Sequence, residues 1–187
     1  MRSRYYHQHK QQKGFTLIEV IIGMVVLAIS FSVLTTLIHP VAQQSADQLH
    51  QVKAAELAQS VLNEIQNKAF DNNSDMAGGR VRCGETGEVD CTFTTGAEDG
   101  ETRTVFNDVD DYNGLEYGNE YTKGGIENSQ GEVISLYTGY SMRISVINDA
   151  NYNGSGSLDN KTAKLITVTI TTPTDFAMSF STYRANF

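Results

Sequence analysis

Residues 14–20 read Gly-Phe-Thr-Leu-Ile-Glu-Val, and they mark an abrupt change in the character of the chain. Before them, residues 1–14 hold four basic side chains and no acidic one. The next 24 residues, 15–38, hold a single charged side chain, Glu19. As a helix they would span roughly 36 Å, enough to cross a hydrocarbon core of about 30 Å. The sequence therefore predicts a transmembrane helix over residues 15–39, with its basic flank in the cytoplasm.

Two simpler interpretations of this segment are available. An ordinary secretory signal has an apolar region of about 7–15 residues, which is shorter than the one here. A plain membrane anchor explains the length equally well, and a carboxylate near the membrane surface can reach the interface. Neither explains why Gly14 precedes the apolar run. A charge inside a membrane helix costs up to about 2.5–3.5 kcal/mol, so Glu19 indicates a function or a partner.

Gly14, Phe15 and Glu19, placed at this junction, resemble the N-terminal signature of the type IV pilin and pseudopilin superfamily. The resemblance implies that a prepilin peptidase cuts after Gly14 and that the new N-terminus, Phe15, is N-methylated. It also implies that Glu19 neutralises the N-terminal amine of a neighbouring subunit during filament assembly. Such pairing is physically reasonable, because each charge alone in lipid is costly and opposite charges offset one another.

Beyond the apolar run, apolar side chains recur at steps of three or four residues, which predicts that the helix continues amphipathically to about residue 70. We expect a bend near Pro40, because proline cannot donate a backbone hydrogen bond. The predicted stripe consists of Ala42, Ala46, Leu49, Val52, Ala55, Ala58, Leu62, Ile65 and Ala69.

The C-terminal part alternates apolar and polar residues over 140–146, 166–171 and 176–181. Period-two alternation with β-branched and aromatic residues predicts antiparallel strands with one buried face. We also expect short strands within Arg80–Thr94 and Thr102–Asn107, although the sequence does not give a strand order for this region.

These patterns predict an α+β protein with the type IV pilin-like fold. Its long N-terminal helix would have a transmembrane half and an amphipathic half, the latter packed on an antiparallel β-sheet head. The expected parts are a prepilin leader over residues 1–14, a transmembrane helix over 15–39, an amphipathic helix over 40–70, and a globular β-rich head over 71–187.

Charge and motif content exclude several functions. The chain has 14 basic and 22 acidic residues, and the leader holds four of the basic ones. The remaining side chains thus carry a formal charge of −12, which argues against nucleic acid as a partner. No nucleophile elbow, phosphate loop or histidine-centred site appears, so we expect neither an enzyme nor a cofactor.

Cys83 and Cys91 are the only cysteines. In an oxidising compartment outside the inner membrane they can form a disulfide. A structural zinc site is a weaker alternative, because no histidine follows His50 to complete the ligands. A catalytic thiol is weaker still for lack of a downstream base.

Asp108, Asp110 and Asp111 form an acidic string that ends in Tyr-Asn-Gly, as does a second segment near residue 154. Carboxylate-rich loops can bind calcium, but the spacing does not match an EF-hand. The three aspartates are therefore a weak calcium candidate, and surface turns are the simpler interpretation.

Taken together, the chain resembles a minor pilin of the mannose-sensitive haemagglutinin (MSHA) pilus. That implies a prepilin held by one span in the bacterial inner membrane, with a periplasmic head, and later incorporated into a pilus that supports surface attachment. The implied partners are prepilin peptidase, major and minor pilins, the inner-membrane assembly platform, and membrane lipid before assembly. The alternatives are a type II secretion pseudopilin and a tip adhesin whose tyrosines bind surface glycans.

Overall fold

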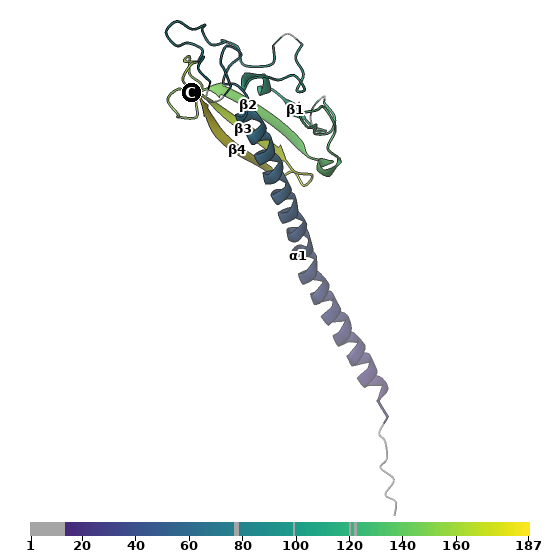
Figure 1. Cartoon of the computed structure of the whole chain (residues 1–187). Helices are drawn as coiled ribbons and strands as arrows, with labels where there is room; N and C mark the ends of the chain where they lie inside the picture. Colours follow the sequence, from purple (N-terminus) through teal and green to yellow (C-terminus); the bar gives the residue numbers. More distant parts are fainter. Residues whose placement is uncertain (1–13, 77–78, 99, 120, 122) are drawn as a thin grey trace, which may run out of the picture. The chain divides into compact units, whose positions relative to one another are not determined.

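The computed structural model describes residues 14–76, 79–98, 100–119, 121 and 123–187, without the side chains of residues 37–45. Within these ranges the order of elements is α1, η1, β1, η2, β2, β3, β4 (Figure 1). The chain divides into two compact units, residues 1–46 and residues 47–187, and helix α1 contributes to both. Apart from Gly14, the predicted leader lies outside the described residues.

Helix α1, Leu17–Gln66, is apolar in its first part. The segment Leu17–Thr36 has a mean hydropathy of 2.6, and none of it is buried within the chain. Among the described residues it is the one helical segment long and apolar enough to cross a membrane. The long apolar helix predicted from the sequence is confirmed. The backbone is helical through Pro40, but the side chains around it lie outside the described residues, so the bend stays a prediction.

In the second unit, one face of α1 packs into the core of the head. The predicted positions Ala58, Leu62 and Ile65 are buried as expected, whereas Leu49 and Val52 are more than half exposed. Residue spacing shows which side of the helix is apolar but not where along the helix the head begins. The helix is buried only from Ala54 onward, so Leu49 and Val52 stay exposed. The buried helical side chains are Ala54, Leu57, Ala58, Val61, Leu62 and Ile65.

The three strands predicted from alternation are confirmed as β2, Ser141–Asn148, β3, Ala163–Thr171, and β4, Ala177–Ala185. With the short β1, Glu116–Tyr117, they form an antiparallel sheet in the order β1-β2-β3-β4. Because the order in space follows the order in sequence, the sheet is a meander. Figure 1 shows its strands lying beside the C-terminal part of α1.

The strand register places apolar side chains opposite one another on the face that joins the core. Ile144 pairs with Val168, and Val168 pairs in turn with Phe180 on β4. Cross-strand apolar pairs of this kind stabilise a sheet. On the other face, the hydroxyls of Thr167 and Ser181 lie 3.0 Å apart. The alternation in the sequence therefore separates a buried face from a hydroxyl-rich one.

The strands predicted within Arg80–Thr94 and Thr102–Asn107 are wrong, because these residues form turns and irregular loops. Apart from the Asn107 carbonyl, which accepts from the Ala69 amide at 3.3 Å, most of their backbone hydrogen bonds are local. The Gly84 amide donates to the Val89 carbonyl at 2.7 Å, and the Val105 amide donates to the Thr102 carbonyl at 2.8 Å. Neither stretch pairs with a second segment in a β-ladder. Residues that favour strands form a strand only where a partner strand is present, so these stretches stay irregular.

Two short 3-10 helices complete the head: η1, Asp110–Tyr112, and η2, Ser135–Tyr137. The buried tyrosines of both belong to the same core as α1 and the sheet. A long apolar helix followed by a meander sheet packed on its C-terminal half is the α+β arrangement that the sequence predicted.

Ile166 offers a test of this core, since it is fully buried on the central strand. We expect Ile166→Ala to lower the free energy of unfolding by about 2–5 kcal/mol, because it leaves a cavity facing α1. Ser181→Ala, on the exposed face of the neighbouring strand, should change it by less than about 0.5 kcal/mol. Denaturant unfolding followed by tyrosine near-ultraviolet circular dichroism measures both; equal losses would contradict the assigned faces.

Candidate functional site

The junction between leader and helix begins with a helix cap. The Glu19 amide donates a hydrogen bond to the Thr16 hydroxyl at 3.3 Å, and Thr16 precedes the first helical residue, Leu17. A threonine three residues before a glutamate is a known helix-start pattern. Sequence reasoning missed Thr16, although this spacing was present to find it. The cap fixes where the helix begins, and hence where Phe15 stands relative to Glu19.

Gly14 has no role that the described chain itself requires. A side-chain carbon added at Gly14 would meet no atom within 4 Å, and its backbone does not need the left-handed region. Gly14, Phe15, Thr16 and Glu19 line one recess at the start of the helix. Packing within the described chain therefore does not explain a small residue at this point.

Glu19 stands in the first turn of α1, where the helix dipole favours a negative charge. Its side chain is exposed, and it forms no ion pair with any residue that the structure describes. It is surrounded by apolar side chains that are equally exposed, including Phe15, Leu17 and Ile18. The site thus presents one charge, without a partner among the described residues, within a continuous apolar surface.

Hydroxyls of Ser30, Thr35 and Thr36, farther along the apolar segment, bond to backbone carbonyls of the same helix. The Ser30 hydroxyl donates to the Val26 carbonyl at 2.7 Å, and the Thr36 hydroxyl donates to the Val33 carbonyl at 2.8 Å. Such bonds to the preceding turn remove the cost of a hydroxyl in hydrocarbon. The carboxylate of Glu19 has no such bond among the described residues, and it is the one charged side chain of the segment.

In the head, a fully buried lysine holds loops to the sheet. The ammonium of Lys164, on β3, donates to an oxygen of Asp110 at 2.5 Å and to the Phe70 carbonyl at 2.7 Å. It also lies 3.4 Å from an oxygen of Asp71 and over the Phe70 ring. Burial raises the pKa of Asp110, an effect that Lys164 opposes. No local sequence pattern indicates this cluster, because its members are far apart along the chain.

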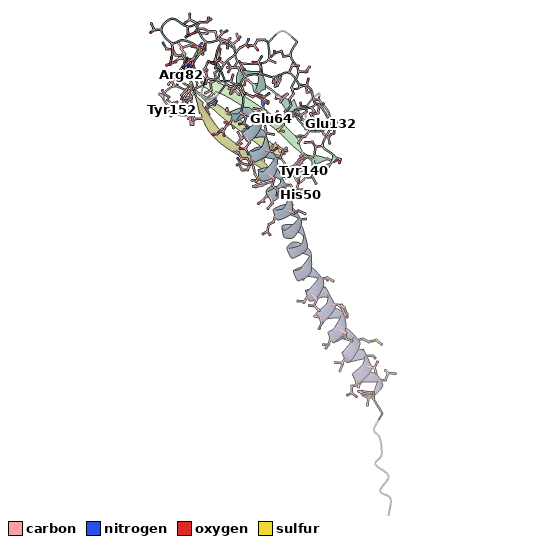
Figure 2. All side chains as sticks on the ribbon, in the orientation of Figure 1. His50, Glu64, Arg82, Glu132, Tyr140 and Tyr152 are labelled. Atoms are coloured by element: carbon pink, nitrogen blue, oxygen red, sulfur yellow. A yellow bond between two sulfur atoms is a disulfide. The ribbon has the colours of Figure 1, made fainter. Side chains whose placement is uncertain are left out.

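A second buried pair joins helix α1 to the loops. Arg103 donates to both carboxylate oxygens of Glu64, at 3.2 and 2.6 Å, and the Tyr112 hydroxyl donates to the same carboxylate at 2.9 Å. Arg103 also donates to the Glu127 carbonyl. Bidentate pairing of this kind fixes both partners. Glu64, labelled in Figure 2, therefore anchors the segments of Arg103 and Tyr112 directly, and that of Glu127 through Arg103.

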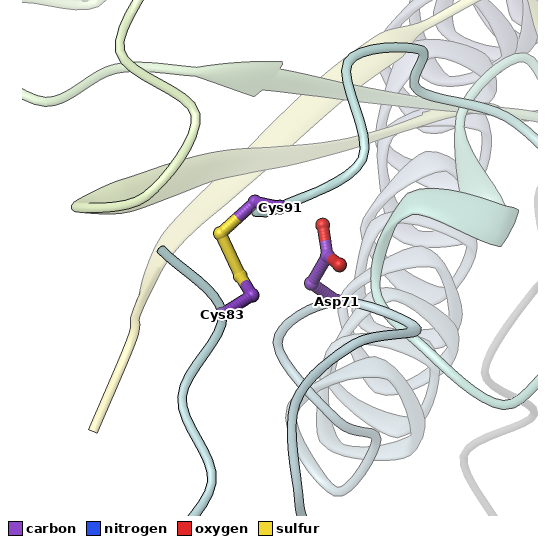
Figure 3. Close-up of side chains that lie close together, drawn as sticks. All are labelled: Asp71, Cys83 and Cys91. Atoms are coloured by element: carbon purple, nitrogen blue, oxygen red, sulfur yellow. A yellow bond between two sulfur atoms is a disulfide. The ribbon is translucent and has the colours of Figure 1, made fainter. Parts of the chain in front are cut away.

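The predicted disulfide between Cys83 and Cys91 is confirmed, with the two Cα atoms 4.8 Å apart. Figure 3 shows Asp71 beside the bonded sulfurs, but its carboxylate is already occupied. One oxygen accepts from the Asn73 amide at 3.0 Å, and the other accepts from the Thr92 amide at 2.9 Å. Because the two sulfurs are bonded to each other and both Asp71 oxygens accept hydrogen bonds, these residues cross-link the loop and do not form a metal site.

The three aspartates of the weak calcium candidate are directed to different places. Asp110 pairs with Lys164, while Asp108 accepts from the Asp111 amide at 3.1 Å. Burial raises the pKa of Asp108 to about 7, and the charges of Asp110 and Asp111 add to this effect. One oxygen of Asp111 instead lies near Glu98 and Glu101, two residues that sequence reasoning had not selected.

The tyrosines suggested for glycan stacking are mostly interior. Tyr112, Tyr117, Tyr137 and Tyr140 are buried, while Tyr152 is 54% exposed. The ring nitrogen Nδ1 of His50 lies 2.7 Å from the Tyr140 hydroxyl, and Figure 2 shows the two residues together where the helix meets the head. With Tyr121, these are the six tyrosines that could have formed a glycan surface, and four of them instead belong to the core.

A comparison with protein-family models identifies one match. The family described as the prokaryotic N-terminal methylation motif matches residues 9–35, which include Gly14, Phe15 and Glu19. No curated protein and no solved structure matches the chain. The family information thus comes from the N-terminal segment, and any role of the head has to be argued from its own geometry.

The disulfide leads to a stability prediction. Replacing both cysteines, Cys83→Ser with Cys91→Ser, should lower the free energy of unfolding by roughly 2–3 kcal/mol, because the short loop regains freedom in the unfolded chain. Treating the wild-type protein with reductant should give a comparable loss, and reductant should have no effect on the double variant. Denaturant titration measures all four conditions; a reductant-sensitive double variant would contradict the assignment.

The buried lysine leads to another prediction. Lys164→Met should destabilise the head by about 3–5 kcal/mol, since it leaves Asp71 and Asp110 buried without their cation. Adding Asp110→Asn to this variant should recover part of the loss. Lys161→Met removes an exposed lysine three residues away and should cost less than about 0.5 kcal/mol. Denaturant unfolding checks the series, and a harmless Lys164→Met would show that the cluster carries no stability.

Proposed function

The N-terminal methylation motif marks this chain as a type IV pilin- or pseudopilin-like subunit, and from that premise we propose that it is a minor pilin of an MSHA-like pilus, of the MshD type. Proteins of this family are structural subunits and not enzymes. The single observation that carries the proposal is the carboxylate of Glu19, which has no ion-pair partner among the described residues and stands at the start of the exposed apolar segment Leu17–Thr36.

The first step of the proposed function is processing at the inner membrane. Prepilin peptidase removes the basic leader by cutting the bond between Gly14 and Phe15, and the new amine of Phe15 is N-methylated. Support comes from Gly14, which the described chain does not itself require, and from the Thr16 cap, which holds Phe15 at the helix start.

The second step is capture by a filament. The processed N-terminus is a cation, and the carboxylate of Glu19 on a neighbouring subunit is its complement. Each charge is unfavourable in an apolar environment alone, and pairing offsets part of that cost. Residues 15–39 then move from lipid into a bundle of similarly apolar helices. Helix association in such surroundings is driven by close packing rather than by removal of water.

This assignment gives the protein two successive locations. It begins as a single-pass protein of the bacterial inner membrane, with its head in the periplasm, where the disulfide can form. It then enters the pilus by way of the inner-membrane assembly platform, together with major and minor pilins. In the pilus it supports biogenesis and surface attachment, and its acidic head faces the medium.

Two alternatives use the same N-terminal segment. A pseudopilin of a type II secretion system would share the processing and the Glu19 pairing, so the two differ in which assembly platform takes up the subunit. A tip adhesin would need exposed stacking groups in the head. The burial of Tyr112, Tyr117, Tyr137 and Tyr140 argues against a tyrosine-based glycan site.

Glu19→Ala provides the test. We expect this variant to insert and to lose its leader, yet to be recovered from sheared filaments at less than about a tenth of the wild-type amount, since an unpaired amine in an apolar core costs more than about 1.4 kcal/mol. Intact mass of the wild-type subunit should correspond to a chain that begins at Phe15, carries one methyl group and lacks two hydrogens at the disulfide.

The matched control is Glu56→Ala, which removes an exposed glutamate from the same helix within the head. It should enter filaments normally. Recovery of the wild-type chain with its original methionine would rule out processing, and normal incorporation of Glu19→Ala would rule out the pairing. Recovery with secretion pseudopilins in place of pilus subunits would identify the type II system.

A further inference from the structure

Three carboxylates outside the N-terminal site converge in the head. Glu98 and Glu101 belong to one loop, and Asp111 belongs to η1. One oxygen from each lies within 4.8 Å of the others. Ligands of a single Ca²⁺ lie at about 2.3–2.6 Å from the ion, so two of them can be up to about 5 Å apart. The three oxygens are therefore close enough to share one ion.

A second observation indicates that something binds there. Asp111 is only 1% exposed, and its Oδ2 accepts from the amides of Asn107 and Asp108 at 2.8 and 3.1 Å. Its Oδ1 is buried and has no hydrogen-bond partner among the described residues. A buried carboxylate oxygen without a partner is costly and rare in native structures. Asp111 therefore brings to the cluster a buried carboxylate with one oxygen that no described residue satisfies.

The two glutamates repeat this feature. In each, Oε2 is buried and has no hydrogen-bond partner within the described part of the chain. The Glu101 amide donates to the Glu98 carbonyl at 2.9 Å, and Gly100 takes a positive φ of 82° between them. This turn places both glutamates on the same side of the loop. Burial and the neighbouring Asp111 raise the pKa of Glu98 to about 7, as expected when carboxylates meet without a cation.

No basic side chain in the described residues neutralises the cluster. The two buried cations of this region are engaged elsewhere, Lys164 with Asp110 and Asp71, and Arg103 with Glu64. The cluster thus combines three acidic groups, three unpaired oxygens and no counter-charge from within the described chain. A bound metal ion would supply that charge.

We propose that Glu98, Glu101 and Asp111 bind one calcium ion, which fastens the loop of the two glutamates to η1. The ligands are all oxygens, which favours a hard cation over zinc or copper. Two of them come from an irregular loop, which suits the flexible coordination of Ca²⁺ better than the strict octahedron of Mg²⁺. Water would complete the coordination on the exposed side. This site goes beyond the proposed pilus role and differs from the sequence-based candidate, with which it shares only Asp111.

Binding at this site would act on the head as a whole. The segment before η1 is bonded to the end of the helical region, where the Val109 amide donates to the Ala69 carbonyl at 3.1 Å and Ala69 bridges to Asp108. An ion held by Asp111 would therefore link the loop of Glu98 and Glu101 to the segment that follows α1. Because the ion binds the folded head only, it would raise the stability of the head by mass action.

The test uses the full-length chain in a non-ionic detergent, stripped with chelator and dialysed. Thermal unfolding of the head is followed by circular dichroism while CaCl₂ is added, and isothermal titration calorimetry measures binding directly. We expect the Tm to rise with calcium and to be half-saturated at about 10⁻⁴–10⁻³ M, the range of extracellular calcium modules. The same concentrations of MgCl₂ should produce a smaller shift.

The decisive variant is Glu98→Gln with Glu101→Gln, which keeps the shape of the loop and removes two charges. It should raise the half-saturating calcium concentration by about tenfold or more, since ligand charge sets the affinity of such sites. Asp111→Asn is a weaker probe, because Asp111 also holds two backbone amides and its replacement can unfold η1. Glu88→Gln, an exposed glutamate of the disulfide loop, is the matched control and should respond like wild type.

Three outcomes would overturn the proposal. A folded wild-type protein that shows neither a Tm shift nor a heat of binding at millimolar calcium would exclude the site. An unchanged calcium response in the double glutamine variant would place the binding elsewhere. An equal response to magnesium would exclude calcium as the specific ion. None of these results bears on leader removal or filament entry, so the two proposals stand or fall separately.

Discussion

The apolar segment at the start of α1 is a surface that the chain cannot cover by itself. Every backbone group from Leu17 to Thr36 lies within helix, the hydroxyls of Ser30 and Thr36 bond to preceding carbonyls, and none of the segment is buried. In water this exposed apolar area would be strongly unfavourable. Lipid or other apolar helices would cover such a segment, and in both environments a Glu19 without a partner among the described residues stands out. The proposed insertion, processing and assembly depend on what covers that apolar surface and on what pairs with the Glu19 carboxylate.

The head contains long loops with little secondary structure, and other interactions hold them in place. Its apolar core is formed by α1, the meander sheet and tyrosines from η1 and η2. The loops between α1 and β2 are fixed by buried charges, with Lys164 drawing Asp71 and Asp110 to β3 and Arg103 drawing a loop to Glu64. Such pairs specify an arrangement more than they stabilise it, because desolvation cancels much of their attraction. The disulfide adds one covalent restraint to the same region.

The sequence predicted the features whose signals are local. The apolar run and Glu19 could be read directly, and the alternation around Ile144 and Val168 predicted strands and their buried faces. The failures have a common cause in contacts between distant residues. The segments Arg80–Thr94 and Thr102–Asn107 have strand-like composition but no partner strand, and the exposure of Leu49 depends on where the sheet ends. Glu98, Glu101 and Asp111 converge only once η1 is packed, so no spacing rule could have grouped them. The Thr16 cap is the exception, a local signal that was overlooked.

The meander has a consequence for the order of events during export. The buried face of α1, Ala54 to Ile65, is covered mainly by β2 and β3, whose residues lie about a hundred positions later in the chain. Lys164 likewise reaches the Phe70 carbonyl across a separation of 94 residues. Closing contacts over such distances is entropically slow, whereas the β2–β3 and β3–β4 hairpins are local. In the proposed role the membrane helix enters the membrane first and the head crosses after it, so the inner face of α1 would stay uncovered until the C-terminal strands have crossed.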